Sequence, residues 1–191
     1  MNDKKTLRIF IKEKRKLLSI NEINKLSNDL FNNFIKNINT FNINFKNQNI
    51  AGYFPIKNEI SDIKILEFLK NKYNCNISLP KIYNNTLIFK KWNLNINELI
   101  IKQNKNFKLL ELDDNKETII PNILLIPSLV FDIYKNRIGY GKGYYDNYLQ
   151  SNKNSIKIGI CYDFQIYNEE IENNINDIKM NYVISDKKII K

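Results

Sequence analysis

Three apolar segments of this chain each run directly into a proline. They read QNIAGYFP (48–55), CNISLP (75–80) and NILLIP (122–127). Apolar runs of this length are typical of buried strands, and proline interrupts a central strand because it has no backbone N–H to donate. We therefore expect three strands of one sheet, each ending at its proline.

Helical periodicity fills much of the sequence before and between these strands. Residues 3–18 carry apolar side chains every three or four positions, as on one face of a helix. Another stripe of the same helix is basic and consists of Lys4, Arg8, Lys12 and Arg15. The sequence SINE (19–22) has the pattern of a capping box, which predicts a second helix that ends near residue 38.

Further helices and strands continue the alternation. Helices are expected after Ser61 and over 143–151, and strands over 86–92, 107–112, 156–162 and 180–185, with 188–191 as a hairpin partner of the last strand. This order predicts an α/β fold, a three-layer Rossmann-like domain with a mostly parallel central sheet and helices on both faces. No linker divides the chain, so residues 1–191 are expected to form one domain. Ligands of such sheets bind beyond the carboxyl ends of the strands, where the segments after the three prolines should converge.

The residue types present exclude several kinds of chemistry. The chain has 191 residues and no histidine, which rules out Ser-His-Asp triads and the usual zinc sites. Cys75 and Cys161 are too far apart in sequence for a metal-binding motif, and we expect a cytoplasmic protein with two inert thiols. No apolar run is long enough to span a bilayer and the N-terminus lacks a secretory pattern, so no membrane association is expected.

A net charge of +10 favours anionic partners. Overuse of lysine and asparagine along the whole chain can account for this excess, so the positions of the basic residues are more informative than their number. A basic module that binds RNA or single-stranded DNA through lysine, arginine and tyrosine side chains remains an alternative interpretation, although nucleic acid is not the expected partner.

Three of the five glycines, Gly139, Gly141 and Gly143, lie in the segment RIGYGKGYYD (137–146). Glycine gives the backbone access to unusual dihedral angles and leaves no side chain in the way. Amides exposed in this manner at the start of a helix form an anion site. The spacing matches neither the P-loop nor the GxGxxG motif, so the pattern alone leaves a mobile surface loop as an alternative.

The residues around these glycines suit a nucleotide phosphate. Arg137 can form paired hydrogen bonds to phosphate oxygens, and Lys142 adds a mobile positive charge. Asp146 is a hard oxygen donor of the kind that binds Mg²⁺. The side chains that can stack on a flat ring or hydrogen-bond to it are Tyr140, Tyr144 and Tyr145. Phosphate binding is therefore the favoured interpretation.

The chain resembles the 5-formyltetrahydrofolate cyclo-ligases, also called 5,10-methenyltetrahydrofolate synthetases. The segment LLIPSLVFDIYKNRIGYGKGYYDNYL (124–149) is similar to the signature of that family and is long enough to be specific by itself. The segments YFPIKNEISD (53–62) and SLPKIYNNTLIFKKW (78–92) and the basic first helix are also similar. The resemblance thus touches most of the chain.

This resemblance implies an activity. Members of the family convert 5-formyltetrahydrofolate to 5,10-methenyltetrahydrofolate with ATP as co-substrate and Mg²⁺ as cofactor, and they release ADP and phosphate. The formyl oxygen is phosphorylated before the ring closes. We therefore expect a single α/β domain, monomeric, whose partners are the small molecules ATP and a reduced folate.

The resemblance also implies roles for residues at matching positions. Those expected to bind ATP are Lys4, Arg8, Arg137, Gly139, Gly141, Lys142, Gly143, Tyr144 and Tyr145. Those expected to bind the folate are Phe54, Glu59, Tyr140, Gly141, Lys142, Gly143 and Tyr144. The expected catalytic residues are Arg137, Lys142 and Tyr144, and the expected magnesium ligand is Asp146.

Two positions depart from the family pattern. Asn181 stands where relatives carry a second metal-binding aspartate, so either its carbonyl oxygen binds Mg²⁺ or the nearby Asp177 does so. Tyr140 stands where relatives often carry arginine, which leaves one fewer positive charge for the phosphates. The first departure leaves open a relative that binds folate with weakened or absent catalysis.

Overall fold

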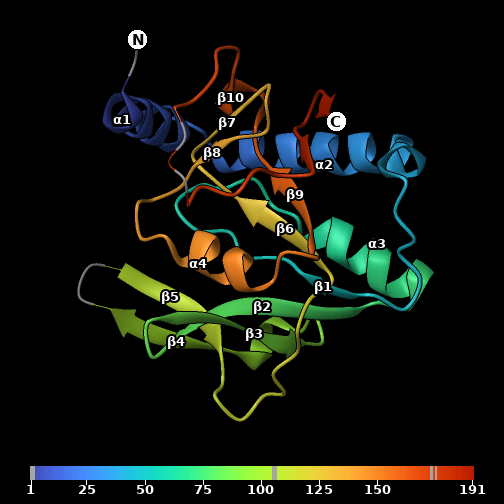
Figure 1. The fold of residues 1–191 in the computed structure, drawn as a ribbon. Helices are drawn as coiled ribbons and strands as arrows, with labels where there is room; N and C mark the ends of the chain where they lie inside the picture. Colours follow the sequence, from blue (N-terminus) through green and yellow to red (C-terminus); the bar gives the residue numbers. More distant parts are fainter. Residues whose placement is uncertain (1–2, 105–106, 173, 175) are drawn as a thin grey trace.

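A seven-stranded sheet forms the centre of the protein in a computed structural model that describes residues 3–104, 107–172, 174 and 176–191 (Figure 1). Its strands lie in the order β12-β11-β9-β6-β1-β2-β3. They are β1 (Asn49–Ala51), β2 (Asn76–Tyr83), β3 (Thr86–Trp92), β6 (Ile123–Pro127), β9 (Ile156–Ile160), β11 (Tyr182–Ile184) and β12 (Ile189–Ile190). Neighbours from β11 to β2 pair in parallel, and the edge strands β12 and β3 pair antiparallel. The mostly parallel sheet is as predicted.

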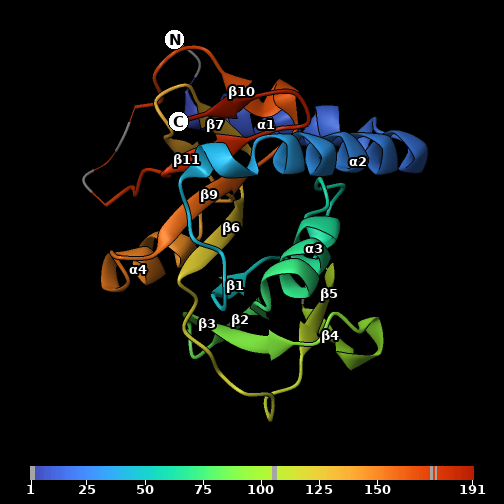
Figure 2. The same cartoon turned by 90° about the vertical axis from the view of Figure 1, so that its right-hand side faces the viewer.

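Helices cover both faces of this sheet, which confirms the three layers. The helices are α1 (Lys4–Lys16), α2 (Ile20–Lys36), α3 (Ile63–Tyr73) and α4 (Tyr144–Ser151), with short 3-10 helices η1 (Ile38–Phe41), η2 (Ile96–Glu98) and η3 (Asp163–Gln165). α2 and α3 lie on one face and α4 on the other (Figure 2). β6 is buried on both sides, because Ile123 and Leu125 join the α2–α3 core while Leu124 and Ile126 join the α4 core. No helix within the described ranges is long and apolar enough to cross a membrane.

A second, smaller sheet was not predicted. It joins β7 (Val130–Asp132), β8 (Arg137–Ile138) and β10 (Ile166–Tyr167) in the order β10-β7-β8. Leu7 and Ile11 of α1 share a buried apolar cluster with residues of β7 and β8. Strands of two or three residues have no readable periodicity, so the sequence around them resembled a loop.

Only β6 ends at its proline as predicted, since β1 ends at Ala51, before Pro55, and β2 continues through Pro80. On one side its neighbour β1 ends at Ala51, which pairs with Ser78, so Pro80 has a strand partner only in β3. Proline is tolerated where no neighbouring strand requires its missing N–H. Asn84 and Asn85 form the turn into β3, with φ of 46° and 59°.

A two-stranded hairpin lies beside β2 and contains the expected strand over 107–112. It pairs β4 (Leu99–Asn104) with β5 (Phe107–Leu112) in antiparallel order. The buried Lys81 side chain of β2 donates from Nζ to the carbonyl oxygen of Leu112 (2.7 Å) and pairs with Asp114 (2.7 Å). These contacts hold the end of the hairpin against the central sheet.

Two N-terminal caps fix where the first helices begin. The carboxylate of Asp3 accepts hydrogen bonds from the first turn of α1. At α2 the predicted capping box is present, since Glu22 N donates to Ser19 Oγ (3.3 Å) and Ser19 N donates to Glu22 Oε2 (2.8 Å).

The two sheets approach each other closely at Gly159 of β9. A Cβ atom at this position would lie 2.5 Å from Cε1 and 2.7 Å from Cζ of Phe131 in β7. The Phe131 ring is fully buried in the cluster that also contains residues of β6 and α4. Because β7 leads into residues 133–139, this contact helps to place that segment.

Gly159→Ala is expected to destabilise the protein by about 1–3 kcal/mol, because the added methyl group has no room beside Phe131. Urea unfolding followed by circular dichroism measures the loss. The double variant Gly159→Ala/Phe131→Leu should lose less than the sum of the two single losses, since the smaller side chain makes room. Strictly additive losses would contradict the proposed contact.

Candidate functional site

A pocket of about 610 Å³ opens at the carboxyl edge of the central sheet. Its wall is formed by α1, by residues 53–59 after β1, by β2, β3 and β5, and by residues 137–146 around the start of α4. Pro80 and Pro127 also lie on this wall. The segments associated with the three prolines therefore converge on one rim, as expected for this class of sheet.

The glycine-rich segment forms one end of the pocket. Gly141 and Gly143 have left-handed backbone conformations, with φ of 93° and 69°. No described atom lies within 4 Å of the position that a Cβ would occupy at either glycine. Gly143 directly precedes α4, so the unpaired N–H groups of the first helical turn are close to the pocket. Arg8 Nε donates to the carbonyl oxygen of Gly139 (2.9 Å), which holds α1 against this segment.

Two ion pairs lie at the same end. Arg137 Nη2 contacts Asp146 Oδ1 at 2.7 Å, and Lys4 Nζ contacts Asp177 Oδ2 at 2.9 Å. Partial burial raises the pKa of Asp177, but hydrogen bonds from Asn174 N and Lys4 outweigh it and hold that pKa below its usual value. This end of the pocket thus offers cations for phosphate oxygens and carboxylates for a metal ion.

The rest of the pocket has an apolar wall. Its members come from several elements and are Phe54, Ile56, Leu79, Pro80, Ile82, Leu87, Leu110 and Pro127. Tyr140, Tyr144 and Tyr145 also line the pocket. An apolar surface with aromatic side chains suits a flat heterocyclic ring, and the few polar groups beside it would fix the ring's orientation.

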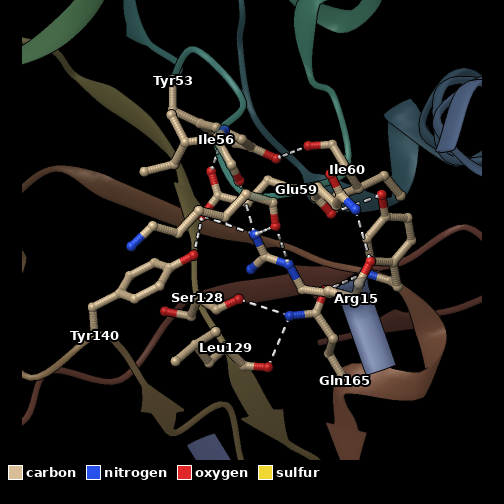
Figure 3. A network of polar contacts seen from close by, with 12 residues as sticks. Arg15, Tyr53, Ile56, Glu59, Ile60, Ser128, Leu129, Tyr140 and Gln165 are labelled. Carbon is tan, nitrogen blue, oxygen red and sulfur yellow. Dashed lines mark hydrogen bonds and ion pairs between the residues drawn. The ribbon is translucent and has the colours of Figure 1, made fainter. Parts of the chain in front are cut away.

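Glu59 is a carboxylate on the pocket wall, and it is only 6% exposed. Its Oε2 accepts a hydrogen bond from Ile56 N (3.1 Å), and its Oε1 accepts one from the Tyr140 hydroxyl (2.9 Å) (Figure 3). Arg15 Nη2 lies 3.6 Å from the same Oε1. Burial raises the pKa of Glu59, and the nearby Arg15 charge only partly opposes this effect.

Asp62 lies completely buried three residues further on. Its Oδ2 accepts a hydrogen bond from Tyr53 N (3.2 Å), and its Oδ1 has no partner among the described residues. Gly52 makes room for it, since a Cβ there would lie 2.5 Å from Asp62 Oδ2. Burial raises the pKa of Asp62 well above its ordinary value, and the neighbouring Glu59 adds to the effect.

The pocket brings together nearly all the residues expected from the sequence. Those on its wall are Lys4, Arg8, Phe54, Glu59, Arg137, Gly139, Tyr140, Gly141, Lys142, Gly143, Tyr144, Tyr145 and Asp146. Asn181 is the exception. It is exposed just before β11, and its Oδ1 accepts a hydrogen bond from Lys157 N (2.8 Å). Since β9 and β11 run in parallel, this position is at the amino edge of the sheet, whereas its alternative Asp177 lies on the pocket wall.

A metal ion in this pocket would need ligands from a substrate. Within the part of the chain that the structure describes, no three His, Cys, Asp or Glu side chains are grouped so that they could hold a metal ion. Asp146 and Asp177 both line the charged end. Mg²⁺ is commonly held by one or two carboxylates together with phosphate oxygens and water, and the residues present fit this arrangement.

The residues near the pocket that were not assigned to the site from the sequence include Lys12, Arg15, Lys57 and Asp62. Lys12 and Lys57 place their ammonium groups 5.7 Å and 5.3 Å from the centre of the Tyr140 ring. Arg15 and Asp62 are buried and do not line the pocket. The basic stripe of the first helix contained a signal for Lys12 and Arg15, but periodicity alone does not distinguish a buried cation from a solvated one.

Known proteins are similar to this chain along most of its length. Residues 1–186 match the model of the 5-formyltetrahydrofolate cyclo-ligase family. The 5-formyltetrahydrofolate cyclo-ligase of Mycoplasma genitalium is 37% identical over 142 residues, which is 72% of each chain. The protein of the same name from Haemophilus influenzae is 34% identical over 127 residues, covering 62% of this chain and 65% of the relative.

Two solved structures share the fold over nearly the whole chain. The NMR structure of Aquifex aeolicus 5,10-methenyltetrahydrofolate synthetase has a TM-score of 0.77 and 26% identity, covering 97% of this chain and 91% of that one. The 5,10-methenyltetrahydrofolate synthetase from Mycoplasma pneumoniae has a TM-score of 0.73 and 26% identity, covering 97% and 99%.

The raised pKa of Asp62 predicts a pH-dependent stability. The folded protein keeps this proton at pH values where the unfolded chain, with an ordinary value of 3.8, loses it. The stabilisation of the folded state by this proton is therefore complete below the ordinary pKa of 3.8. It decreases as the pH rises towards the pKa of Asp62 in the folded protein. Asp62→Asn cannot ionise, so its free energy of unfolding relative to wild type should increase between pH 4 and pH 8. Urea unfolding at several pH values measures this difference, and parallel curves would show that Asp62 is not held protonated.

Proposed function

Since this chain belongs to the 5-formyltetrahydrofolate cyclo-ligase family, we propose that its pocket converts 5-formyltetrahydrofolate to 5,10-methenyltetrahydrofolate, with ATP as co-substrate and ADP and phosphate as further products. One observation carries the assignment to this pocket. A single cavity joins a glycine-rich, cationic end to an apolar wall with a buried carboxylate. The first part suits a nucleotide phosphate and the second a pterin ring. Residues 1–191 are proposed to serve this activity as one domain.

The ATP phosphates are proposed to bind at residues 139–143. The left-handed glycines there leave the backbone accessible, and the first turn of α4 adds unpaired N–H groups. Lys4 and Arg8 approach from α1, and Arg137 and Lys142 from the segment itself. Tyr144 and Tyr145, at the start of α4, complete the proposed nucleotide site.

The folate is proposed to bind against the apolar wall. Phe54, Tyr140 and Tyr144 offer aromatic surface for the pterin ring. Glu59 can accept hydrogen bonds from ring N–H groups, provided that its carboxylate is ionised and correctly oriented. Gly141, Lys142 and Gly143 would face the formyl group from the nucleotide side, so that both substrates meet at this segment.

The chemistry needs two bond-forming steps. The formyl oxygen attacks the γ-phosphorus of ATP, and the bond from that phosphorus to the bridging oxygen breaks and releases ADP. N10 of the folate then attacks the formyl carbon and loses its proton, and the carbon–oxygen bond breaks to release phosphate. Arg137 and Lys142 are proposed to neutralise charge on the transferred group, with Tyr144 as the third catalytic residue. Phosphoryl transfer depends mainly on positioning and charge neutralisation, so no histidine is required.

Asp146 and Asp177 are proposed as the residues that hold Mg²⁺. When bound, the ion would neutralise phosphate charge and help to orient the phosphates. Lys4 and Arg137, which pair with these carboxylates in the structure, would then be available to phosphate oxygens. The amino-edge position of Asn181 argues against its participation.

The comparisons give no support to the alternative of a nucleic-acid-binding module. The alternative of a relative with weakened catalysis rested on Asn181, and the position of Asp177 on the pocket wall supports the active enzyme instead. We propose a cytoplasmic setting because Cys75 and Cys161 are both free, buried thiols. The monomeric state stays a prediction.

The proposed reaction is tested by incubating the purified protein with 5-formyltetrahydrofolate and MgATP and following the ultraviolet absorbance of the methenyl product. Lys142→Ala should raise the KM for ATP by roughly tenfold, because one charge-assisted contact is lost. Gly141→Val should raise the KM for ATP further, since a β-branched residue does not readily adopt a φ of 93°. A folded wild-type protein without product would reject the function, and unchanged kinetics of both variants would reject the role of this segment.

A second test distinguishes Asp177 from Asn181 as the metal ligand that acts beside Asp146. Asp177→Asn and Asp146→Asn should each raise the Mg²⁺ concentration required for half-maximal activity by roughly tenfold. Asn181→Ala serves as the matched control and should leave this concentration unchanged. If Asn181→Ala raised this concentration and Asp177→Asn left it unchanged, Asn181 would be restored as the ligand.

A further inference from the structure

Arg15 is a charged residue with an unusual position. It belongs to α1, a helix on the outside of the fold, yet it is only 2% exposed. Its Nη2 donates to the carbonyl oxygen of Ile56 (2.9 Å), and its Nε donates to that of Lys57 (3.1 Å). The backbone of Arg15 also takes part, because its carbonyl oxygen accepts a hydrogen bond from Asn58 Nδ2 (3.0 Å).

These contacts hold a turn that is unfavourable by itself. Lys57 and Asn58 are consecutive residues with left-handed backbones, with φ of 49° and 56°. Non-glycine residues adopt this conformation at a cost, and two in succession persist only where surrounding contacts enforce them. Within the turn, Glu59 N donates to Ile56 O (3.0 Å), so the turn that Arg15 holds is also the one that presents Glu59.

Arg15 also supplies the opposite charge for Glu59. The ion pair at 3.6 Å is buried on both sides, with 2% and 6% of the side chains exposed. The titratable groups that face Glu59 are Arg15 from α1, Tyr53 and Asp62 from 53–62, Tyr140 and Tyr145 from 140–145, and Tyr162 after β9, with Lys12 and Lys57 beyond the Tyr140 ring. Arg15 pairs directly with the carboxylate (Figure 3).

We propose that Arg15 is a positioning residue for folate recognition, which fixes both the charge and the orientation of Glu59 without touching the substrate. This inference rests on the proposed function, in which Glu59 contacts the folate. Arg15 does not line the pocket, whereas Glu59 does. Removing Arg15 should therefore weaken folate binding and leave the nucleotide end intact.

The test compares Arg15→Gln and Arg15→Lys with wild type. Arg15→Gln should raise the KM for 5-formyltetrahydrofolate by about tenfold or more, because a buried carboxylate loses its charged partner. Arg15→Lys keeps the charge but not the fork of donors, so its effect should be intermediate. The KM for ATP should stay within about twofold of wild type in both variants, since Lys4 and Arg8 are unchanged. Lys16→Gln, an exposed charge of the same helix, is the control and should alter neither value.

The pH profile provides a readout that a purely structural role would not change. Folate affinity should fall as the pH decreases through the pKa of Glu59, because a protonated carboxyl accepts hydrogen bonds less well. The Arg15 charge lowers that pKa. In Arg15→Gln the loss of folate affinity on acidification should therefore begin at a higher pH than in wild type. Raising the pH should recover part of the folate affinity of this variant. Glu59→Gln should remove this dependence.

Several results would overturn the inference. One is an unchanged folate KM in a folded Arg15→Gln protein. Another is an equal increase of the KM for folate and the KM for ATP with an unshifted pH profile. That result would indicate that the whole pocket has become less ordered. If Arg15→Gln does not fold, Arg15→Lys decides: an unchanged folate KM there contradicts the proposal. Failure of the proposed function is distinct, because wild type itself would then show no turnover.

Discussion

The Glu59 carboxylate lies almost entirely out of water, and much of the site depends on how that burial is compensated. A buried carboxylate is unfavourable unless hydrogen bonds and a cation surround it. Its partners come from α1, from the turn after β1 and from the glycine-rich segment. These three segments are far apart in the sequence, so they must pack together to compensate the charge of Glu59. Where they pack together, they form one side of the pocket.

Local patterns were sufficient to predict the architecture and the location of most of the pocket. Apolar runs that alternate with amphipathic helices define a parallel sheet, and the direction of parallel strands brings the ends of β1, β2 and β6 to the same edge. Glycines gathered in a glycine-poor chain identified residues 139–143. The predictions that succeeded depended on residues that are neighbours in sequence.

The features that local patterns did not reveal depended on distant neighbours. Pro80 lies inside β2 because β1 is too short to reach it, which no pattern within β2 reveals. Asn181 is remote from the pocket because it precedes a strand rather than following one. The spacing of Arg15 matches that of the pocket residues on its helix, and only the turn at 56–59 makes it a buried residue. Asp62 is the N-cap residue of α3, but its side chain makes no capping hydrogen bond. It accepts a hydrogen bond from Tyr53 N instead.

The first helix connects the two ends of the site rigidly. Lys4 contacts Asp177 and Arg15 contacts the turn before Glu59, and 11 positions of regular helix span about 16 Å between them. One extra residue within this interval would rotate every later side chain by about 100° around the axis. The helix thus fixes the distance between the proposed nucleotide end and the proposed folate end of the pocket. Substitutions on its exposed side would leave both contacts in place, whereas an insertion or deletion between Lys4 and Arg15 would break one of them.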